Sequence, residues 1–545
     1  MFLRRNRVRS GVPEGGQFSA GFHNESGVTL SDMPAGVFRC VNCDRLSSRG
    51  SEHRCLSPGL VPLSTSAWDV LSVVLNAGGR PIIVGGSVRD SMIARMHGSR
   101  ILPKDVDIEV YGLTAGELRE ALRPLGERNS AWVDEVGASF GVIKVHGIYG
   151  DFDVSLPRRD SKTGVGHRGF DVEIDPELSE LEAFARRDFT VNAMGYDPVP
   201  ETLIDHYGGS ADLQVGVLRH VSDRFSDDPL RVLRGVQMAG RFDMRFAPET
   251  AELCRDLADR FQELPKERIW GEWEKIATRA ESPSQSLAAL HEVDWEKHFP
   301  ELAACRDVAQ DPKWHPEGPV HVHLGLSADA AATWASKNRV SENDRAVVVL
   351  ASMFHDLGKA THTQLPDPNL AETPGTRITS HGHAEAGVEP ASALLERIGA
   401  PAKYAEKILP IISNHMAVAG VQQGGTPSAN AVRRLIRRLD APGGRGPGLQ
   451  LWAAVVGADH AGRGSASGSN PADAWVRVAS KLGTADRPRG GYLTGHHLKH
   501  YGFEPGPVFG QILGAALRAQ DEGEFSDEQS AVKWLESNMD QWSRE

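Results

Sequence analysis

Residues 81–112 constrain the fold of this chain most, because they predict a strand, a glycine turn, a helix and a second strand in close succession. A short apolar run ends at Gly85 and Gly86, and the segment from Ser87 can begin a helix. Two glycines at such a junction let the backbone approach a phosphate, and the helix N-terminus offers N–H groups to it. The stretch therefore predicts an α/β unit with a phosphate-binding turn.

The second strand of this stretch carries acidic residues on one face. Side chains alternate along a strand, so Asp105, Asp107 and Glu109 oppose Val106 and Ile108. An Asp-x-Asp strand is usually a solvated face. Two carboxylates placed in this way can also hold a divalent cation, and oxygen ligands suit Mg²⁺, which shares its shell with substrate phosphates. We therefore predict a Mg²⁺ site here.

A third carboxylate is available in the segment GDFDVS, where Asp151 and Asp153 alternate with Phe152 and Val154. This alternation again predicts a strand with both acidic side chains on one face. A third carboxylate on a neighbouring strand would complete the metal site. The spacing does not choose between the two residues.

Composition narrows the classes of protein to which this chain can belong. A length of 545 residues predicts three or four domains, and 40% apolar with 24% charged residues describes an ordinary soluble protein. The sequence has no apolar run of about 18 residues, so no membrane span is expected. Five cysteines at this length do not form a disulfide framework, which favours a cytoplasmic location. The net charge of −12 means that any RNA would need local basic patches.

We divide the chain into five segments by composition and motif. These are a largely disordered extension (1–65), an α/β head (66–215), a helical neck (216–310), a helical domain rich in histidine (311–465) and a helical tail (466–545). The extension holds a Cys-x2-Cys and His-x-Cys constellation of the kind that binds structural Zn²⁺, although chance cysteines in a polar tail are an equal alternative. Its members are Cys40, Cys43, His53 and Cys55.

The helical domain carries histidines and aspartates at the ends of successive helical segments. A single histidine would more often be a satisfied core or surface residue, but the repeated pattern around the string HDLGK predicts a metal site. The predicted ligands are His323, His355, Asp356, His383, His415 and Asp459. His381 competes with His383 for one position, and spacing leaves the choice open.

Several strings occur in an order that resembles a known family. GGSVRD, PKDVDIEV, RRDFTVNAM and DDPLRVLR resemble motifs of class II tRNA nucleotidyltransferases and bacterial poly(A) polymerases, in the DNA polymerase β superfamily. The histidine-rich segment resembles the HD superfamily of metal-dependent phosphohydrolases. The resemblance implies an α+β fold, in which a polymerase-β-like nucleotidyltransferase head with a small mixed sheet precedes an all-helical neck, HD domain and tail.

The same resemblance implies an activity and its residues. The activity is template-independent addition of C, C and A to the tRNA 3′ end from CTP and ATP, with Asp105 and Asp107 holding Mg²⁺ and Asp153 assisting. The implied nucleotide-binding residues are Gly85, Gly86, Arg89, Arg187, Asn192, Asp228, Arg231 and Arg234. Pro229, with Ser226 or Asp227 before it, predicts a helix N-terminus in the segment that carries the last three.

By the same resemblance, Asp228 and Arg231 select the base, although such a pair is more often a salt bridge on a solvated helix. The chemistry agrees, because a carboxylate accepts from the exocyclic amine of C or A and a guanidinium donates to the ring nitrogen beside it. G and U present a carbonyl where this amine should be.

The expected partners are the tRNA acceptor arm, CTP and ATP, with no membrane and no DNA. Arg433, Arg434, Arg437 and Arg438 form a basic cluster that could contact phosphates. The alternatives are a poly(A) polymerase, an enzyme that adds only CC or only A, a phosphohydrolase whose head binds RNA, and a non-catalytic RNA-binding protein. The expected HD metal is Mg²⁺ or a divalent transition metal, with hydrolysis of phosphate monoesters or 2′,3′-cyclic phosphates as a second activity.

Overall fold

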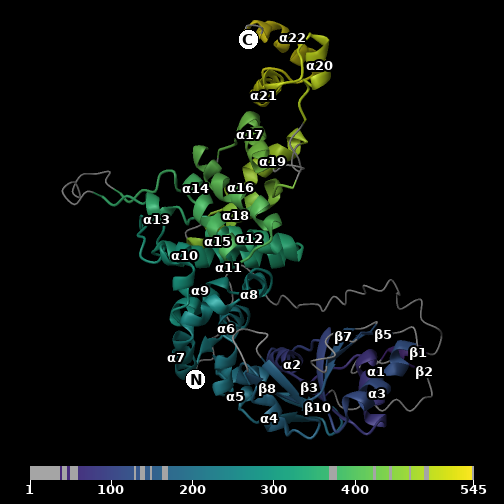
Figure 1. Ribbon diagram of the computed structural model, residues 1–545. Helices are drawn as coiled ribbons and strands as arrows, with labels where there is room; N and C mark the ends of the chain where they lie inside the picture. Colours follow the sequence, from purple (N-terminus) through teal and green to yellow (C-terminus); the bar gives the residue numbers. More distant parts are fainter. Residues whose placement is uncertain are drawn as a thin grey trace. The chain divides into compact units, whose positions relative to one another are not determined.

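The computed structural model describes residues 37–39, 46–48, 59–127, 131–134, 142–147, 150–162, 170–366, 377–421, 425–440, 445–464, 468–483 and 490–542. The chain forms two compact units, residues 1–157 with 195–204 and residues 158–194 with 205–545 (Figure 1). The four predicted zinc ligands lie outside the described residues. Among the described helices, none has the length and apolar character needed to cross a membrane.

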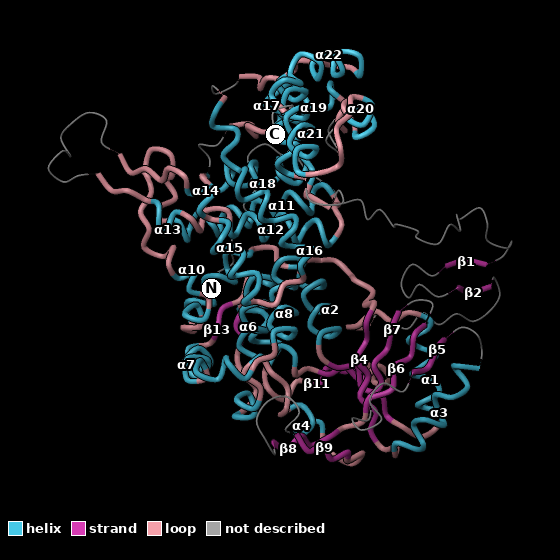
Figure 2. Tube along the Cα trace, turned by 45° about the horizontal axis from the view of Figure 1, so that its top comes forward, coloured by secondary structure: helices cyan, strands magenta, loops and turns pink. Residues whose placement is uncertain are grey.

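The first unit is built on a mixed sheet of seven strands, which Figure 2 shows in magenta. Its central pair, β4 and β7, is parallel, and the other neighbours are antiparallel. This confirms the small mixed sheet predicted for the head. In spatial order the strands are β11 (Thr202–Ile204), β10 (Gly195–Asp197), β3 (Arg80–Val84), β4 (Asp105–Tyr111), β7 (Gly150–Ser155), β6 (Val142–Gly147) and β5 (Ala131–Asp134). A separate hairpin joins β1 (Val37–Arg39) and β2 (Leu46–Ser48).

Three helices cover this sheet: α1 (Thr65–Asn76), α2 (Gly86–Met96) and α3 (Ala115–Glu127). α1 and α3 pack on each other, and α2 packs on β3 and β4. Local capping fixes where α1 and α3 begin. At the start of α1, the side chain of Ser64 accepts from the N–H of Ala67. Thr114 and Glu117 form a reciprocal capping box at the start of α3.

The second unit begins with a short hairpin and small helices, and continues as a helical stack. Its first elements are β8 (Arg158–Lys162), β9 (Phe170–Ile174), α4 (Glu180–Phe184), η2 (Thr190–Asn192), α5 (Gly209–Val215), β12 (Val217–Leu218) and η3 (Asp223–Asp227). The neck follows with α6 (Leu230–Phe242), β13 (Arg245–Phe246), α7 (Pro248–Asp256), η4 (Ala258–Glu263), α8 (Lys266–Arg279), α9 (Pro283–Glu292), η5 (Glu296–His298) and α10 (Pro300–Ala303). α6 packs on both α8 and α9.

Pro229 lies at the start of α6 as predicted, but Ser226 and Asp227, which were expected to precede it at the helix N-terminus, do not cap this helix. Those residues belong to the 3₁₀ helix η3, whose own N-terminus is capped by the side chain of Ser222. Asp228 is extended, Pro229 follows as the N-cap, and α6 starts at Leu230. Proline favours this first turn because its φ is already helical and its missing N–H would be unpaired there.

The histidine-rich helices pack around α11, which contacts α12 and α18 extensively. The helices are α11 (Val320–Asn338), α12 (Glu342–Phe354), α13 (Lys359–His362), α14 (His383–Ala386), α15 (Val388–Arg397), α16 (Ala402–Asn414), η6 (His415–Gly420), α17 (Ala429–Leu439) and α18 (Gly448–Gly462). α12 is almost wholly apolar from Ala346 to Phe354 and is buried throughout this stretch. A helix buried all round must lie in the interior of the unit.

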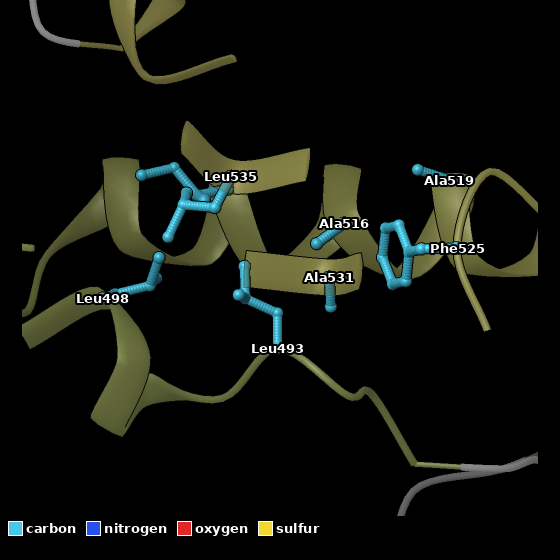
Figure 3. Packing of buried hydrophobic residues seen from close by; sticks show 8 residues of the cluster. Leu493, Leu498, Ala516, Ala519, Phe525, Ala531 and Leu535 are labelled. Carbon is cyan, nitrogen blue, oxygen red and sulfur yellow. The ribbon is translucent and has the colours of Figure 1, made fainter. Parts of the chain in front are cut away.

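Within residues 466–545 the helices pack in two different ways. α19 (Asp473–Leu482) packs on α17 and α18, with the Trp475 ring 5.7 Å from that of Trp452. α20 (Gly495–His500), α21 (Pro507–Glu522) and α22 (Glu528–Asn538) instead share a small core of their own (Figure 3). That core contains Leu493, Leu498, Ile512, Ala516, Ala519, Phe525, Ala531 and Leu535.

Arg437, a member of the predicted phosphate-binding cluster, forms an ion pair within the protein. Its guanidinium donates to both carboxylate oxygens of Asp521 on α21, at 2.5 and 2.8 Å. This two-point pairing links α17 to the tail. The members of the predicted basic cluster that remain to contact RNA phosphates are therefore Arg433, Arg434 and Arg438.

Candidate functional site

The predicted phosphate-binding turn lies between β3 and α2. Gly85 has a φ of 74°, in the left-handed region where a side chain is unfavourable, and α2 begins directly after it. The hydroxyl of Ser87 donates to the carbonyl of Asp105 at 2.9 Å, which joins the helix start to the beginning of β4. Arg89 is buried and pairs with Asp90 at 2.7 Å. The turn and the acidic strand are thus adjacent within the first unit.

The strand register brings four carboxylates together in two rows. Asp105 is paired with Asp151 and Asp107 with Asp153 across the parallel strands β4 and β7. Paired residues on neighbouring strands point to the same face of a sheet. Asp105 and Asp107 are exposed, whereas Glu109 is fully buried and accepts a hydrogen bond from the Tyr111 hydroxyl.

The surroundings distinguish the two candidates for the third carboxylate. Lys144 lies 3.2 Å from Asp153, and His146 lies 2.9 Å from Asp151. Asp153 is the neighbour of Asp107 and lies further from the start of strand β7 than Asp151 does. A donor set made only of carboxylate oxygens fits Mg²⁺ and is a poor match for a soft metal.

In the second unit, Asp188 is the centre of a polar network that the sequence interpretation did not single out. Its Oδ1 accepts from the N–H of Phe189 at 2.7 Å and the amide of Asn192 at 2.9 Å, and its Oδ2 accepts from Arg234 Nε at 2.8 Å. Burial would raise the pKa of the Asp188 carboxyl, but Arg234 and these hydrogen bonds lower it to about 2. Asn192 and Arg234, both predicted nucleotide ligands, are thus held in place by one buried carboxylate.

Replacing Asp188 by asparagine should lower the free energy of unfolding of the second unit by about 2 kcal/mol at pH 7. The folded pKa of about 2 lies below the ordinary 3.8, so the charge stabilises the fold above about pH 4. That contribution is lost as the pH falls towards 2. Urea unfolding of both proteins at pH 7 and pH 3 measures this, and the difference between them should shrink by about half at pH 3. An equal difference at both pH values would contradict the assignment.

Asp228 and Arg231 do not pair with each other. The guanidinium of Arg268 on α8 donates to both oxygens of Asp228, at 2.6 and 3.2 Å. Arg231 donates to the carbonyls of Arg186 and Arg224, at 2.6 and 2.8 Å. Both predicted base-selecting side chains are therefore fixed by separate partners.

Arg187 lies beside this network. Its guanidinium is 3.5 Å from the carbonyl of Asn192 and stacks over the Phe184 ring at 5.6 Å. The structure thus places Arg187, Asn192, Asp228, Arg231 and Arg234 in one region of the second unit. The sequence pattern did not indicate that Asp188 would hold Asn192 and Arg234.

The six predicted HD residues converge on one buried cluster. Asp356 lies at its centre, with Oδ1 3.1 Å from His383 Nε2 and 3.6 Å from His415 Nε2, and Oδ2 3.2 Å from His355 Nε2. Asp459 Oδ1 is 3.0 Å from His323 Nε2. The cluster favours His383 over His381, because His383 is buried in it and His381 is exposed.

Backbone carbonyls orient three of the four imidazoles. The Nδ1 atoms of His355, His383 and His415 lie 2.5–2.8 Å from the carbonyl oxygens of Ser352, Ser380 and Ile412. A carbonyl only accepts, so each Nδ1 carries a hydrogen and each Nε2 faces the carboxylates, where it would be the ligand atom for a bound metal. Around a divalent cation at about 2.1 Å, ligand atoms lie roughly 3 Å apart, as they do here. The residues thus fit a metal ion.

The charges of the cluster agree with such a site. Burial would raise the pKa of Asp356, but His355 and Lys359 hold it well below the usual range, and Lys359 Nζ is 2.6 Å from the carboxylate. Burial would also raise the pKa of Asp459, but Arg463, its main stabilising charge, helps to hold that pKa well below the usual range. Burial lowers the pKa of His415, whereas in His383 and His323 hydrogen bonds to carboxylates outweigh burial and raise the pKa. The sequence interpretation missed Lys359, Arg463 and Glu317 as participants.

Comparisons with known proteins identify the domains of this chain. The family model described as "Poly A polymerase head domain" matches residues 82–219. The model "Probable RNA and SrmB- binding site of polymerase A" matches residues 243–306, and the model "HD domain" matches residues 320–435. Fold and site together define a nucleotidyltransferase of the polymerase-β type joined to an HD domain.

Curated relatives define the family more narrowly. The chain is 35% identical over 343 residues to the multifunctional CCA protein of Xanthomonas campestris pv. campestris (strain B100), covering 62% of this chain and 75% of that protein. It is 33% identical over 388 residues to the multifunctional CCA protein of Xylella fastidiosa (strain M23), covering 70% and 83%. The chain belongs to the family of multifunctional CCA proteins.

Solved structures agree in fold. The Bacillus stearothermophilus CCA-adding enzyme in complex with CTP superposes with a TM-score of 0.55 at 18% identity, covering 87% of this chain and 96% of that one. A CCA-adding enzyme in apo form II gives a TM-score of 0.53 at 18% identity, covering 86% and 94%. These likenesses confirm the predicted head, neck and helical architecture.

Proposed function

We propose that this chain adds C, C and A to the 3′ end of tRNA, using CTP and ATP and no nucleic-acid template. Membership of the multifunctional CCA protein family carries this proposal. The four carboxylates on β4 and β7 support it, because they provide an oxygen-only donor set beside a glycine turn. A tRNA-processing enzyme of this kind would act in the cytoplasm.

In the head, Asp105 and Asp107 would hold Mg²⁺, with Asp153 as the third carboxylate. Bound Mg²⁺ supplies charge for the attacking 3′-hydroxyl and for the pyrophosphate leaving group. Gly85 and Gly86 let the triphosphate approach the backbone at the N-terminus of α2. Positioning and electrostatic stabilisation do most of the work in phosphoryl transfer.

In the second unit, Asp228 and Arg231 would read the base. Arg268 fixes the Asp228 carboxylate with a two-point ion pair, and backbone carbonyls fix Arg231. A rigid acceptor beside a rigid donor matches the amine and ring nitrogen of C and A. G and U would leave a buried acceptor facing another acceptor, which costs about 1–3 kcal/mol.

Replacing Asp228 by alanine should lower the selectivity for CTP and ATP over UTP and GTP by about 10- to 100-fold, as expected for a loss of 1–3 kcal/mol. The measurement compares kcat/KM for the four triphosphates on tRNA lacking its terminal CCA. Asp223→Ala is the matched control, because Asp223 is an exposed aspartate five residues away. Unchanged selectivity in Asp228→Ala, with normal selectivity in the control, would remove Asp228 from base selection.

We propose a second activity for the HD domain, which is hydrolysis of phosphate monoesters or 2′,3′-cyclic phosphates. The buried His and Asp cluster around Asp356 supports this proposal. His323, His355, Asp356, His383, His415 and Asp459 would hold Mg²⁺ or a divalent transition metal. A bound metal at such a site lowers the pKa of its water and polarises the phosphoester. Lys359 and Arg463 add positive charge beside the cluster, where a phosphate would bind.

The acceptor arm of tRNA is the proposed macromolecular partner. Arg433, Arg434 and Arg438 on α17 offer a basic surface for phosphates, in a chain whose net charge is −12. A poly(A) polymerase and a partial CC- or A-adding enzyme are distinguished from this proposal by the order and number of nucleotides added.

A further inference from the structure

One ligand of the HD cluster, His323, is oriented differently from the others. His355 and His415 lie at helix C-termini and His383 lies at the start of a short helix, each with the carbonyl of the residue three positions earlier within reach of its ring. Each of these three rings donates its Nδ1 hydrogen to such a carbonyl. His323 instead lies within the first turns of the long helix α11.

At this position none of the described backbone carbonyls accepts a hydrogen bond from the His323 ring. The carbonyl of Pro319, four residues earlier, already accepts from the N–H of His323 at 3.2 Å. The carbonyl of Val320 accepts from Leu324 in the regular pattern of an α-helix. A histidine at this position therefore needs a side-chain acceptor to fix its ring.

Glu317 is that acceptor. Its Oε1 lies 2.7 Å from Nδ1 of His323, and the glutamate side chain is only 5% exposed. The same oxygen lies 2.8 Å from Nδ1 of His315, so one carboxylate oxygen receives two imidazoles. With Nδ1 beside the Glu317 carboxylate, His323 turns Nε2 toward Asp459 at 3.0 Å.

The loop that carries Glu317 is itself tied to the cluster. Gly318 follows with a φ of 110°, a conformation that residues with a Cβ rarely adopt. Gln310 donates from Nε2 to the carbonyl of Gly318 at 2.9 Å and accepts from Lys359 at 2.8 Å. Lys359 in turn pairs with Asp356. Glu317 is therefore fixed relative to the ligands that it supports.

We propose that Glu317 is a positioning residue of the HD metal site, which sets the tautomer and orientation of His323 through its Nδ1 hydrogen. The inference rests on the proposed metal site of the HD domain. A carboxylate that receives the second nitrogen of a ligating histidine also makes the ligand more basic, and its removal typically weakens metal binding 10- to 100-fold.

The test is a titration of the full-length chain, freed of metal by chelation, with Co²⁺. Glu317→Ala should weaken Co²⁺ binding about 10- to 100-fold, and its visible absorption spectrum should change because one ligand is misaligned. Glu317→Gln should recover part of the affinity, because the amide oxygen still accepts from Nδ1. Glu389→Ala, an exposed glutamate on α15, is the matched control and should bind like the wild type.

The possible outcomes distinguish a failure of the role of Glu317 from a failure of the proposed metal site. If the wild-type chain binds no Co²⁺, the proposed metal site itself fails. If the wild type binds and Glu317→Ala binds equally well with an unchanged spectrum, the role of Glu317 is wrong.

His315→Ala tests the remaining alternative, in which His315, Glu317 and His323 hold a cation themselves. We expect it to weaken Co²⁺ binding less than Glu317→Ala; loss of a whole equivalent of Co²⁺ would overturn the positioning role. Unfolding temperatures check that each variant is folded.

Discussion

Replacing Asp107 by asparagine should reduce nucleotide incorporation about a thousandfold or more. The change keeps the size of the side chain and removes one charge from the β4–β7 carboxylates, where Asp107 is paired with Asp153. A metal contributes several kcal/mol of transition-state stabilisation in such a site, and each 1.36 kcal/mol is tenfold in rate. Incorporation of labelled CTP into tRNA lacking CCA measures the loss.

Two matched variants refine this result. Asp153→Asn should cause a loss of similar kind, and Asp151→Asn a much smaller one, since Asp151 is paired with Asp105 at the start of β4 and is held by His146. Co²⁺ binding by the HD cluster should be unchanged in all three variants. Near-normal incorporation in Asp107→Asn would remove the metal assignment in the head, and a larger loss in Asp151→Asn than in Asp153→Asn would exchange their roles.

Replacing Asp356 by asparagine should abolish metal binding and hydrolysis by the HD domain. Asp356 is the carboxylate nearest to His355, His383 and Lys359, and it is fully buried. Its loss leaves the buried Lys359 charge without its carboxylate partner, so stability should also fall by about 3–5 kcal/mol. Release of phosphate from 2′,3′-cyclic nucleotides and from phosphate monoesters, with and without a chelator, measures the activity.

The same preparation contains its own control, because nucleotide incorporation by the head should persist wherever Asp356→Asn remains folded. His381→Asn is the second control, since His381 is exposed and the cluster uses His383. Hydrolysis that survives both Asp356→Asn and chelation would mean that the cluster does not catalyse it.

Local pattern predicted much of the site because the relevant side chains follow from short-range periodicity. Alternation along one strand brought Asp105 and Asp107 to the same face, and the glycine turn before α2 was readable from Gly85 and Gly86. The ends of apolar helices marked His355 and His415 in the same way.

The remaining contacts depend on pairings between distant segments. The register of β4 on β7, which makes Asp153 the neighbour of Asp107, is set by the whole sheet. The partner of Asp228 is Arg268, forty residues along the chain. Strand register and helix packing arise from tertiary structure, so no local signal in the sequence could supply them.

Glu317 illustrates the same limit on a smaller scale. It lies only six residues before His323, yet nothing in the string marks it as a partner. The need for it appears only when His323 is seen within the first turns of α11, where none of the described backbone carbonyls accepts from its ring.

The measurement that tests the central claim most directly is incorporation of each labelled nucleoside triphosphate into four RNAs. These are tRNA lacking CCA, tRNA ending in C, tRNA ending in CC, and an unrelated RNA. We expect CCA, CA and A to be added to the three tRNAs in turn, with no G or U and nothing on the unrelated RNA. Repeated addition of A to any RNA, or no incorporation at all, would contradict the proposed function.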